Sequence, residues 1–319
     1  MRHRASRLGD VQSSERKLTN GRERLTLDAS QTPANCEPAS IGRALVVGAG
    51  TMGSGIAQVI AQAGIQTTLM DADMGSLERG LEAIAKRWHR LAESGRRSPG
   101  EIANFRGNLN PGTIGDAANA DLVIEAIVEK PEPKSALFEE LATITPPQSI
   151  FASNTSSISI SALGHVSGRP DRFLGLHFFN PVPVLPLVEI VRGLETSDRT
   201  LARSMKFVEA IGKTPIVVND SPGFVANRVL LPMINEAISV LQDGVAPAAA
   251  IDEVMKLGMS HPMGPLALAD LIGLDICLDI METLHRDFGD DKYRPAPLLR
   301  RMVGAGKLGR KTGQGFFEY

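Results

Sequence analysis

The sequence predicts an α/β fold in which a doubly wound parallel sheet is followed by an all-helical C-terminal domain. Short apolar runs, which are typical of buried parallel strands, alternate with segments of helical composition up to about residue 220. Beyond that point the strand-like runs stop, and apolar residues recur at helical spacing. We therefore expect a tail over 1–40, a sheet domain over 41–220 and a helical domain over 221–319.

The expected strands are short runs that end at glycine or at polar residues. They are 44–47, 67–70, 122–124, 149–152 and 173–176, and 187–191 and 215–218 are expected to extend the sheet at one edge. The helices expected between them cover 52–63, about 74–94 and a segment around 134–141.

The first 40 residues mix charges of both signs with few apolar residues and show no sustained period. This composition predicts a disordered tail. Arg2, Arg4 and Arg7 are typical of a transit peptide, whereas Asp10 and Glu15 weigh against one. We expect a cytoplasmic protein, with the mitochondrial matrix as the alternative.

Charge and cysteine content restrict the class of protein. The 34 basic and 36 acidic residues give a net charge of -2, which provides no reason to expect nucleic acid or a membrane surface as a partner. No apolar run approaches the roughly 18 residues that would span a bilayer. Cys36 and Cys277 lack metal-ligand spacing, so we expect no metal site and a reducing compartment.

The run G-A-G-T-M-G that begins at Gly48 matches the pattern G-x-G-x-x-G. Gly48 permits a tight turn, Gly50 lets the backbone approach a pyrophosphate, and Gly53 lets the helix pack close to the strand. Thr51 and Met52 begin that helix, whose N-terminal amides favour an anion. The motif alone is also compatible with a turn that binds nothing. A strand before it and a helix after it favour a Rossmann-type dinucleotide site.

Asp71 ends the next predicted strand, 23 residues after Gly48. This is close to the spacing of about 20 residues expected for a carboxylate that binds the ribose hydroxyls. Asp71 would repel a 2′-phosphate, and Ala72 supplies no arginine to accept one. The predicted cofactor is therefore NAD rather than NADP.

His177 follows the apolar run 173–176, at the carboxyl end of a predicted strand, where ligands bind in open α/β sheets. Glu189 lies inside the apolar run 187–191, where an unpaired carboxylate is costly to bury. A proline-rich stretch between them can turn the chain back and bring the carboxylate to the imidazole. Such a pair can accept a proton near neutral pH, which suggests alcohol oxidation. The alternatives are a core histidine and a solvent-facing glutamate.

Two further polar residues are candidates for the same site. Ser156 follows a predicted strand, so its hydroxyl can donate to a substrate oxygen. Its alternative role is to cap a helix that begins at Ile158. Asn227 lies in an apolar helical segment, where its amide either faces a cleft or satisfies a backbone group.

Seven segments resemble the L-3-hydroxyacyl-CoA dehydrogenase family, in particular its 3-hydroxybutyryl-CoA dehydrogenase branch. They run in family order, at 48–57, 121–129, 151–157, 177–183, 221–228, 261–270 and 311–317. The resemblance implies reversible oxidation of an (S)-3-hydroxyacyl-CoA, short-chain in this branch, to the 3-ketoacyl-CoA with NAD.

The resemblance also implies a role for each matching residue. His177 would be the general base and Glu189 its orienting carboxylate, whereas Ser156 would bind the substrate oxygen and Asn227 would help to position it. Asp71 would bind the adenosine ribose. Glu129, Lys134 and Lys311 match family positions near the cofactor.

Coenzyme A and the subunit partner are implied in the same way. The family holds coenzyme A with polar residues of the helix after Asp71, where this chain carries Lys86, Arg87, His89 and Arg90. Its helical domain usually forms a homodimer, and the apolar segment 266–280 suits that role, although it also suits the core of the domain.

Two other functions remain open at this stage. A dehydrogenase of a free hydroxy acid or sugar acid would need a cation near the substrate carboxylate, for which Arg228 is a candidate. A non-catalytic NAD-binding protein would keep the fold without the pair formed by His177 and Glu189.

Overall fold

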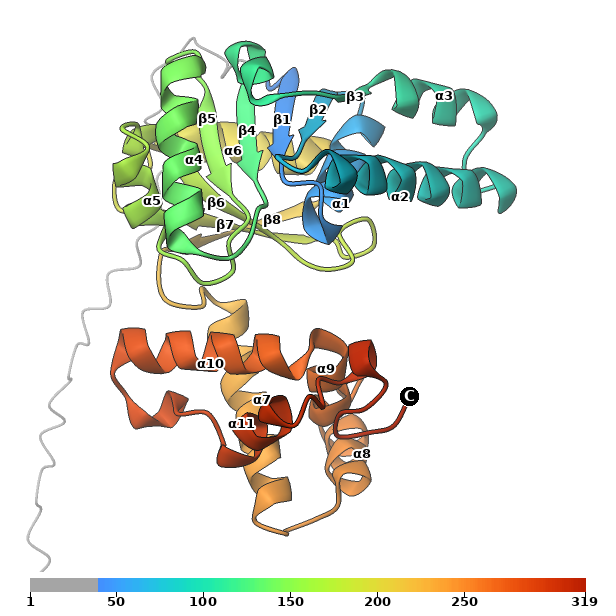
Figure 1. Cartoon of the computed structure of the whole chain (residues 1–319), viewed down its shortest axis with the longest axis vertical. Helices are drawn as coiled ribbons and strands as arrows, with labels where there is room; N and C mark the ends of the chain where they lie inside the picture. Colours follow the sequence, from blue (N-terminus) through green and yellow to red (C-terminus); the bar gives the residue numbers. More distant parts are fainter. Residues whose placement is uncertain (1–39) are drawn as a thin grey trace, which may run out of the picture. The chain divides into compact units, whose positions relative to one another are not determined.

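The computed structural model describes residues 40–319 (Figure 1), so the predicted tail, apart from residue 40, and Cys36 lie outside the described residues. The described part contains one eight-stranded sheet with the order β3-β2-β1-β4-β5-β6-β7-β8. The strands are β1 Arg43–Val47, β2 Gln66–Met70, β3 Leu109–Pro111, β4 Leu122–Glu125, β5 Ile150–Ser153, β6 Phe173–Phe178, β7 Leu187–Arg192 and β8 Thr214–Asn219. The strand order reverses beside β1, as expected for a doubly wound sheet.

The pairing of β7 is the exception to a parallel sheet. It runs antiparallel to β6, whereas every other neighbouring pair is parallel. The connection over 179–186 is too short for the crossover that a parallel pair would need, so the chain returns directly. The predicted extension of the sheet by two further strands at one edge is confirmed.

Helices occupy most connections of the sheet and most of the region that follows it. Those of the sheet domain are α1 Thr51–Gln62, α2 Met74–Glu93, α3 Pro99–Gly107, α4 Pro131–Ile144, α5 Ile160–Val166 and α6 Asp198–Ala210. Those that follow are α7 Ala226–Gln242, α8 Ala248–Met259, α9 Pro265–Ile272, α10 Leu274–Phe288 and α11 Pro297–Gly304. Among residues 40–319, no helix combines the length and apolar character needed to cross a membrane. The predicted succession of a sheet domain and a helical domain is confirmed.

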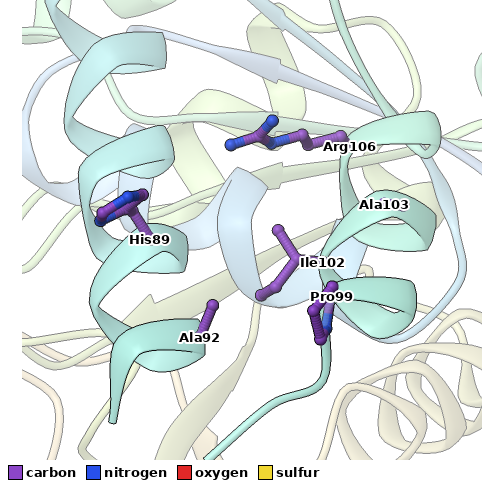
Figure 2. A pocket seen from close by; sticks show the side chains of 6 residues that line it. All are labelled: His89, Ala92, Pro99, Ile102, Ala103 and Arg106. Atoms are coloured by element: carbon purple, nitrogen blue, oxygen red, sulfur yellow. The ribbon is translucent and has the colours of Figure 1, made fainter. Parts of the chain in front are cut away.

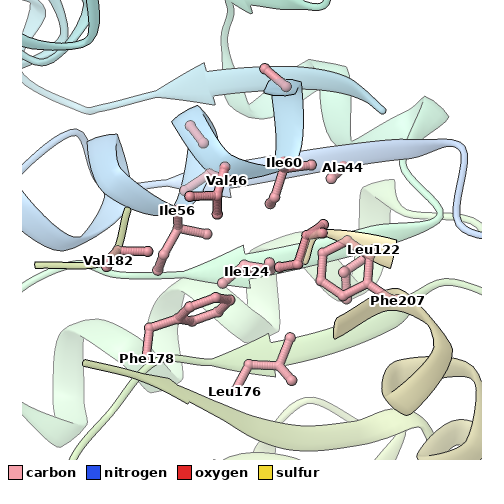
Figure 3. Packing of buried hydrophobic residues seen from close by; sticks show 14 of the residues in the cluster. Ala44, Val46, Ile56, Ile60, Leu122, Ile124, Leu176, Phe178, Val182 and Phe207 are labelled. Carbon is pink, nitrogen blue, oxygen red and sulfur yellow. The ribbon is translucent and has the colours of Figure 1, made fainter. Parts of the chain in front are cut away.

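Alternating side chains of the strands build two cores, one on each face of the sheet. On one face, Val46 and Ile124 pack with Ile56 of α1 and Phe207 of α6 (Figure 3). On the other face lie Leu45, Val47 and Val123 with Phe138 of α4. Successive strand residues point to opposite faces, so a fully apolar strand supplies both cores.

The helical domain has a core of its own. Leu266, Leu274, Cys277 and Met281 are completely buried in it. The segment 266–280 therefore serves mainly as internal core, the second of the two roles considered for it. Burial also raises the pKa of the Cys277 thiol to about 12, which keeps this cysteine protonated and unreactive.

Candidate active site

His177 and Glu189 are directly opposite one another on the antiparallel strands β6 and β7. The imidazole Nδ1 lies 2.7 Å from Glu189 Oε2, and both side chains are buried. Opposite residues of an antiparallel pair share one face of the sheet, so the strand register itself creates the contact. Because a carboxylate only accepts hydrogen bonds, Nδ1 carries the proton and Nε2 remains for a substrate.

The second oxygen of Glu189 is held by the beginning of α7. Oε1 accepts hydrogen bonds from the backbone amides of Val225 (3.2 Å) and Ala226 (3.0 Å). Amides at a helix N-terminus favour a negative charge, and here they satisfy a carboxylate that water does not reach. Glu189 is therefore not the solvent-facing strand residue that was considered as its alternative.

Two aromatic rings confine the imidazole. The ring centroid of His177 lies 4.6 Å from that of Phe179 and 5.6 Å from that of Phe224. Phe224 is buried and has a φ of 50°, a left-handed conformation that is strained for a residue with a bulky side chain. Its neighbour Gly223, with a φ of 71°, begins the same turn into α7. This turn presents the two amides that hold Glu189.

Ser156 and Asn227 are brought together by a hydrogen bond of 3.1 Å from Asn227 Nδ2 to the Ser156 carbonyl. On its other side, the Ser156 amide donates to Glu129 Oε1 at 2.9 Å. The cap of α5 is Ser159, whose hydroxyl accepts from the amide of Ala162. Ser156 is thus held on both sides of its backbone and does not serve as the helix cap.

The glycine turn contains glycines of two kinds. A Cβ on Gly48 would lie 2.4 Å from the Ala126 carbonyl oxygen, and one on Gly53 would lie 1.7 Å from the Gly48 carbonyl oxygen. The fold itself therefore requires both. Within the described chain, a Cβ on Gly50 would have no neighbour within 4 Å. The packing of the described residues therefore does not require a glycine at position 50, in contrast to positions 48 and 53.

The surroundings of this turn fit a dinucleotide. Asp71 Oδ2 accepts from the amide of Ala49 at 2.8 Å, so the carboxylate lies against the turn. The helix α1 begins at Thr51 and Met52, and no side chain of the described residues caps its N-terminus. Its first amides are thus available to an anion.

The residues that match family positions near the cofactor differ in their surroundings. Lys134 is 1% exposed, and its Nζ lies 2.5 Å from Glu125 Oε1 and 3.2 Å from Glu129 Oε2. Burial alone would raise the pKa of Glu129, but Lys134 and the hydrogen bonds from Thr155 and Ser156 lower it below the usual value.

Lys311 is placed apart from these two residues. It forms an ion pair with Asp275 of α10. Among the described residues, no hydrogen bond connects Lys311 with the glycine turn. Its proximity to the cofactor stays a prediction.

The polar residues of α2 considered for coenzyme A make separate contacts within the chain. Lys86 pairs with Glu82, and His89 pairs with Glu93 at 3.2 Å. Arg87 reaches back to Gln58 of α1. A cavity of about 410 Å³ lies between α2 and α3 (Figure 2). It is lined by His89, Ala92, Pro99, Ile102, Ala103 and Arg106, so it does not include the pair of His177 and Glu189.

Sequence reasoning missed three residues around the site. Phe179 and Phe224 confine the imidazole, and no sequence pattern marks their contact with it. Glu125, at the end of β4, is completely buried. A carboxylate within an apolar run singled out Glu189 and marks Glu125 in the same way.

The doubly wound sheet, the open glycine turn and the buried histidine–carboxylate pair are together typical of a nicotinamide-dependent dehydrogenase. Comparison with known families agrees with this class. The NAD binding domain of 3-hydroxyacyl-CoA dehydrogenase matches residues 43–221, and the C-terminal domain of 3-hydroxyacyl-CoA dehydrogenase matches residues 223–319. The chain therefore belongs to the NAD-dependent 3-hydroxyacyl-CoA dehydrogenases, which are oxidoreductases.

Individual relatives are similar over nearly their whole length. A probable 3-hydroxybutyryl-CoA dehydrogenase of Bacillus subtilis is 53% identical over 280 residues, which cover 88% of this chain and 98% of that protein. One of Deinococcus radiodurans is 54% identical over 275 residues, with coverages of 86% and 99%. The crystal structure of (S)-3-hydroxybutyryl-CoA dehydrogenase from Ralstonia eutropha matches with a TM-score of 0.85 and 48% identity, over 88% of this chain and 99% of that one.

Substitution by alanine should affect cofactor binding at Gly50 and stability at Gly53. Gly50→Ala should leave the thermal midpoint within about 1 °C, because a Cβ has room there, but should weaken NADH binding about tenfold or more. Gly53→Ala should lower the thermal midpoint by several degrees, because its Cβ meets backbone. Calorimetry and NADH fluorescence titration would measure both. Unchanged NADH affinity in Gly50→Ala would contradict the proposed approach of the cofactor.

Proposed function

We propose that this enzyme reversibly oxidises a short (S)-3-hydroxyacyl-CoA, such as 3-hydroxybutyryl-CoA, to the corresponding 3-ketoacyl-CoA. The observation that carries the proposal is the buried 2.7 Å contact between His177 and Glu189. The acyl-CoA substrate is supported by the names of the relatives, which are 3-hydroxybutyryl-CoA dehydrogenases over nearly their whole length.

Each residue of the site has a task in the proposed reaction. His177 Nε2 accepts the proton of the 3-hydroxyl group, and Glu189 stabilises the imidazolium that forms. The Ser156 hydroxyl donates to the same substrate oxygen, where negative charge develops as the proton leaves. Asn227 holds the Ser156 backbone in place. NAD, when bound, accepts the hydride from the carbon that carried the hydroxyl group.

The chain's own residues also supply the proposed cofactor contacts. Gly48, Gly50 and Gly53 shape the turn for the pyrophosphate, and the first amides of α1 face it. Asp71 binds the adenosine ribose and excludes a 2′-phosphate in this proposal, which is supported by the contact of its carboxylate with the glycine turn.

A free hydroxy acid is the less favoured substrate. The cation considered for its carboxylate, Arg228, lies 4.4 Å from the ring centroid of Phe288 and donates to the Ser221 hydroxyl. Arg228 is exposed, and both contacts engage its guanidinium with neighbouring side chains of the chain itself. We therefore expect acetoacetyl-CoA to be reduced with NADH and free acetoacetate to be reduced at least 100-fold more slowly in kcat/KM, which a spectrophotometric assay would show. Equal rates for the two substrates would favour the hydroxy acid function.

Replacing His177 with Gln should lower kcat by about 10²- to 10⁴-fold, because the general base is lost. NADH affinity should stay within about threefold, since the glycine turn is untouched. His165→Gln, on an exposed position of α5, is the matched control and should keep its activity. Turnover by His177→Gln at the rate of the unsubstituted enzyme would exclude the imidazole as the base.

We also propose that the protein is a cytoplasmic homodimer. The dimer is supported by eight large apolar side chains of the helical domain, between Val225 and Ile276, which are 44–77% exposed and which a second copy would remove from water. The cytoplasmic assignment is supported by the bacterial relatives.

The dimer predicts a sedimentation mass of twice 34.1 kDa. Leu257→Glu, at the most exposed of these apolar positions, should shift the protein toward the monomer because a charge would be buried at the interface. Leu194→Glu, on a still more exposed leucine of the sheet domain, should leave the dimer intact. Sedimentation of the unsubstituted chain as a monomer at micromolar concentration would contradict the proposal.

A further inference from the structure

The connection between β6 and β7, residues 179–186, is poor in backbone donors. Three of its eight residues, at positions 181, 183 and 186, are proline, which has no amide hydrogen to donate. The amides of Val184 and Leu185 both donate to the Pro181 carbonyl, at 2.9 and 3.0 Å. The carbonyls further along the connection therefore need donors from another part of the chain.

Lys213 supplies two of these hydrogen bonds. Its Nζ donates to the Val182 carbonyl at 2.6 Å and to the Leu185 carbonyl at 2.7 Å. Partial burial lowers the pKa of Lys213, and no nearby carboxylate of the described chain offsets this effect. Lys213 thus serves the connection as a hydrogen-bond donor rather than as a member of an ion pair.

The order of the strands places Lys213 at the edge of the sheet where His177 lies. The strand β8 is parallel to β7, which is antiparallel to β6, so β8 begins where β6 ends. Lys213 directly precedes β8, and its own amide donates to the Val208 carbonyl at 3.0 Å. The next amide, that of Thr214, donates to the Pro186 carbonyl at 2.7 Å. The lysine therefore reaches the connection from a turn that is itself fixed.

The connection held in this way contacts both the base and the helix of the proposed cofactor site. At its beginning, the ring centroid of Phe179 lies 4.6 Å from that of His177. Further along, Val182 is 2% exposed and packs in the same core as Ile56 of α1 (Figure 3). A Cβ on Gly55 would lie 2.9 Å from the Cβ of Val182, so the helix and the connection touch closely.

We propose that Lys213 is a positioning residue that keeps Phe179 against the imidazole of His177 by holding the β6–β7 connection in place. This inference rests on the proposed function, in which His177 Nε2 accepts the proton of the 3-hydroxyl group. The imidazole must then point at a single oxygen atom, and a ring that is free to tilt does so less well. Without Lys213, the carbonyls of Val182 and Leu185 lose their donors, and the connection is held mainly at its ends.

The variant Lys213→Met removes both hydrogen bonds and keeps an unbranched side chain of similar length. With acetoacetyl-CoA and NADH, kcat should fall about fivefold, whereas KM for acetoacetyl-CoA should stay within about twofold. This split is expected because the base loses its orientation while the substrate keeps its contacts. A raised KM with an unchanged kcat would refute the inference, since it would place Lys213 in substrate binding.

A double-mutant cycle tests whether the effect passes through Phe179. In a Phe179→Leu background the aromatic contact with the imidazole is already lost. There Lys213→Met should lower kcat by less than about twofold, compared with about fivefold in the otherwise unsubstituted enzyme. Equal losses in the two backgrounds, or no loss in the unsubstituted enzyme, would overturn the inference.

Two control variants separate positioning from charge and from stability. Lys206→Met removes an exposed lysine of α6 and should leave kcat unchanged. Val208→Ala shortens a completely buried side chain of the same helix, so it should lower the thermal midpoint by several degrees but keep kcat within about twofold. If Val208→Ala lowered kcat with the same dependence on Phe179, lost stability would explain both variants and the inference would fail.

The unsubstituted enzyme distinguishes this inference from the proposed function. If it does not turn over acetoacetyl-CoA, the proposed function and the inference fail together. If it does, and the losses in the cycle are additive, the inference alone is excluded.

Discussion

The carboxylate of Glu189 is the group on which the arrangement of the site depends. One of its oxygens fixes the imidazole of His177, and the other receives two amides from the beginning of α7. Both oxygens of a buried carboxylate need hydrogen-bond donors. The strand pair and the first helix of the helical domain are therefore joined through the two oxygens of Glu189. The base is therefore oriented by two parts of the chain at once, and the strained turn at Phe224 is the geometry that makes this possible.

A second buried carboxylate, Glu125, organises the neighbouring side of the site by similar means. It too uses both oxygens, and it too connects a strand end to a loop that contains a candidate catalytic residue. The polar groups of the site are thus held mainly by other charged groups and by backbone amides rather than by apolar packing. Such hydrogen bonds have stricter geometric requirements than apolar contacts, which suits residues that must meet reacting atoms.

Much of the fold could be predicted because most of its strands contain an apolar run and many of its helices have a clear period. The runs 44–47 and 122–124 are examples, and both lie within observed strands. The strand Leu109–Pro111 could not be found, since three residues with one apolar side chain carry no periodic signal. The helix α3 was missed although Ser98 and Glu101 form a capping box at its start, a signal that is readable in the sequence.

Prediction of the site succeeded where a residue type was unusual for its surroundings. A carboxylate in the apolar run 187–191 led to Glu189, and the spacing from Gly48 led to Asp71. The aromatic contacts to His177 were not predictable, because Phe179 and Phe224 are ordinary apolar residues until the backbone brings them to the ring. The close contact of Lys134 with Glu125 could not be foreseen either, since it depends on how a helix is seated against a strand end.

The antiparallel pairing of β6 and β7 has a consequence for how such an enzyme can change over evolution. His177 and Glu189 meet because they are opposite in register, not because the eight residues between the two strands have a particular length. Insertions or deletions in that connection can reshape the entrance for a different substrate while the two side chains stay together. A slip of one residue in the pairing, by contrast, would turn the carboxylate to the other face of the sheet. Phe179 contacts the imidazole and Val182 is buried in the core, so the other positions of the loop are the ones free to diversify, whereas the alignment of the strands is not.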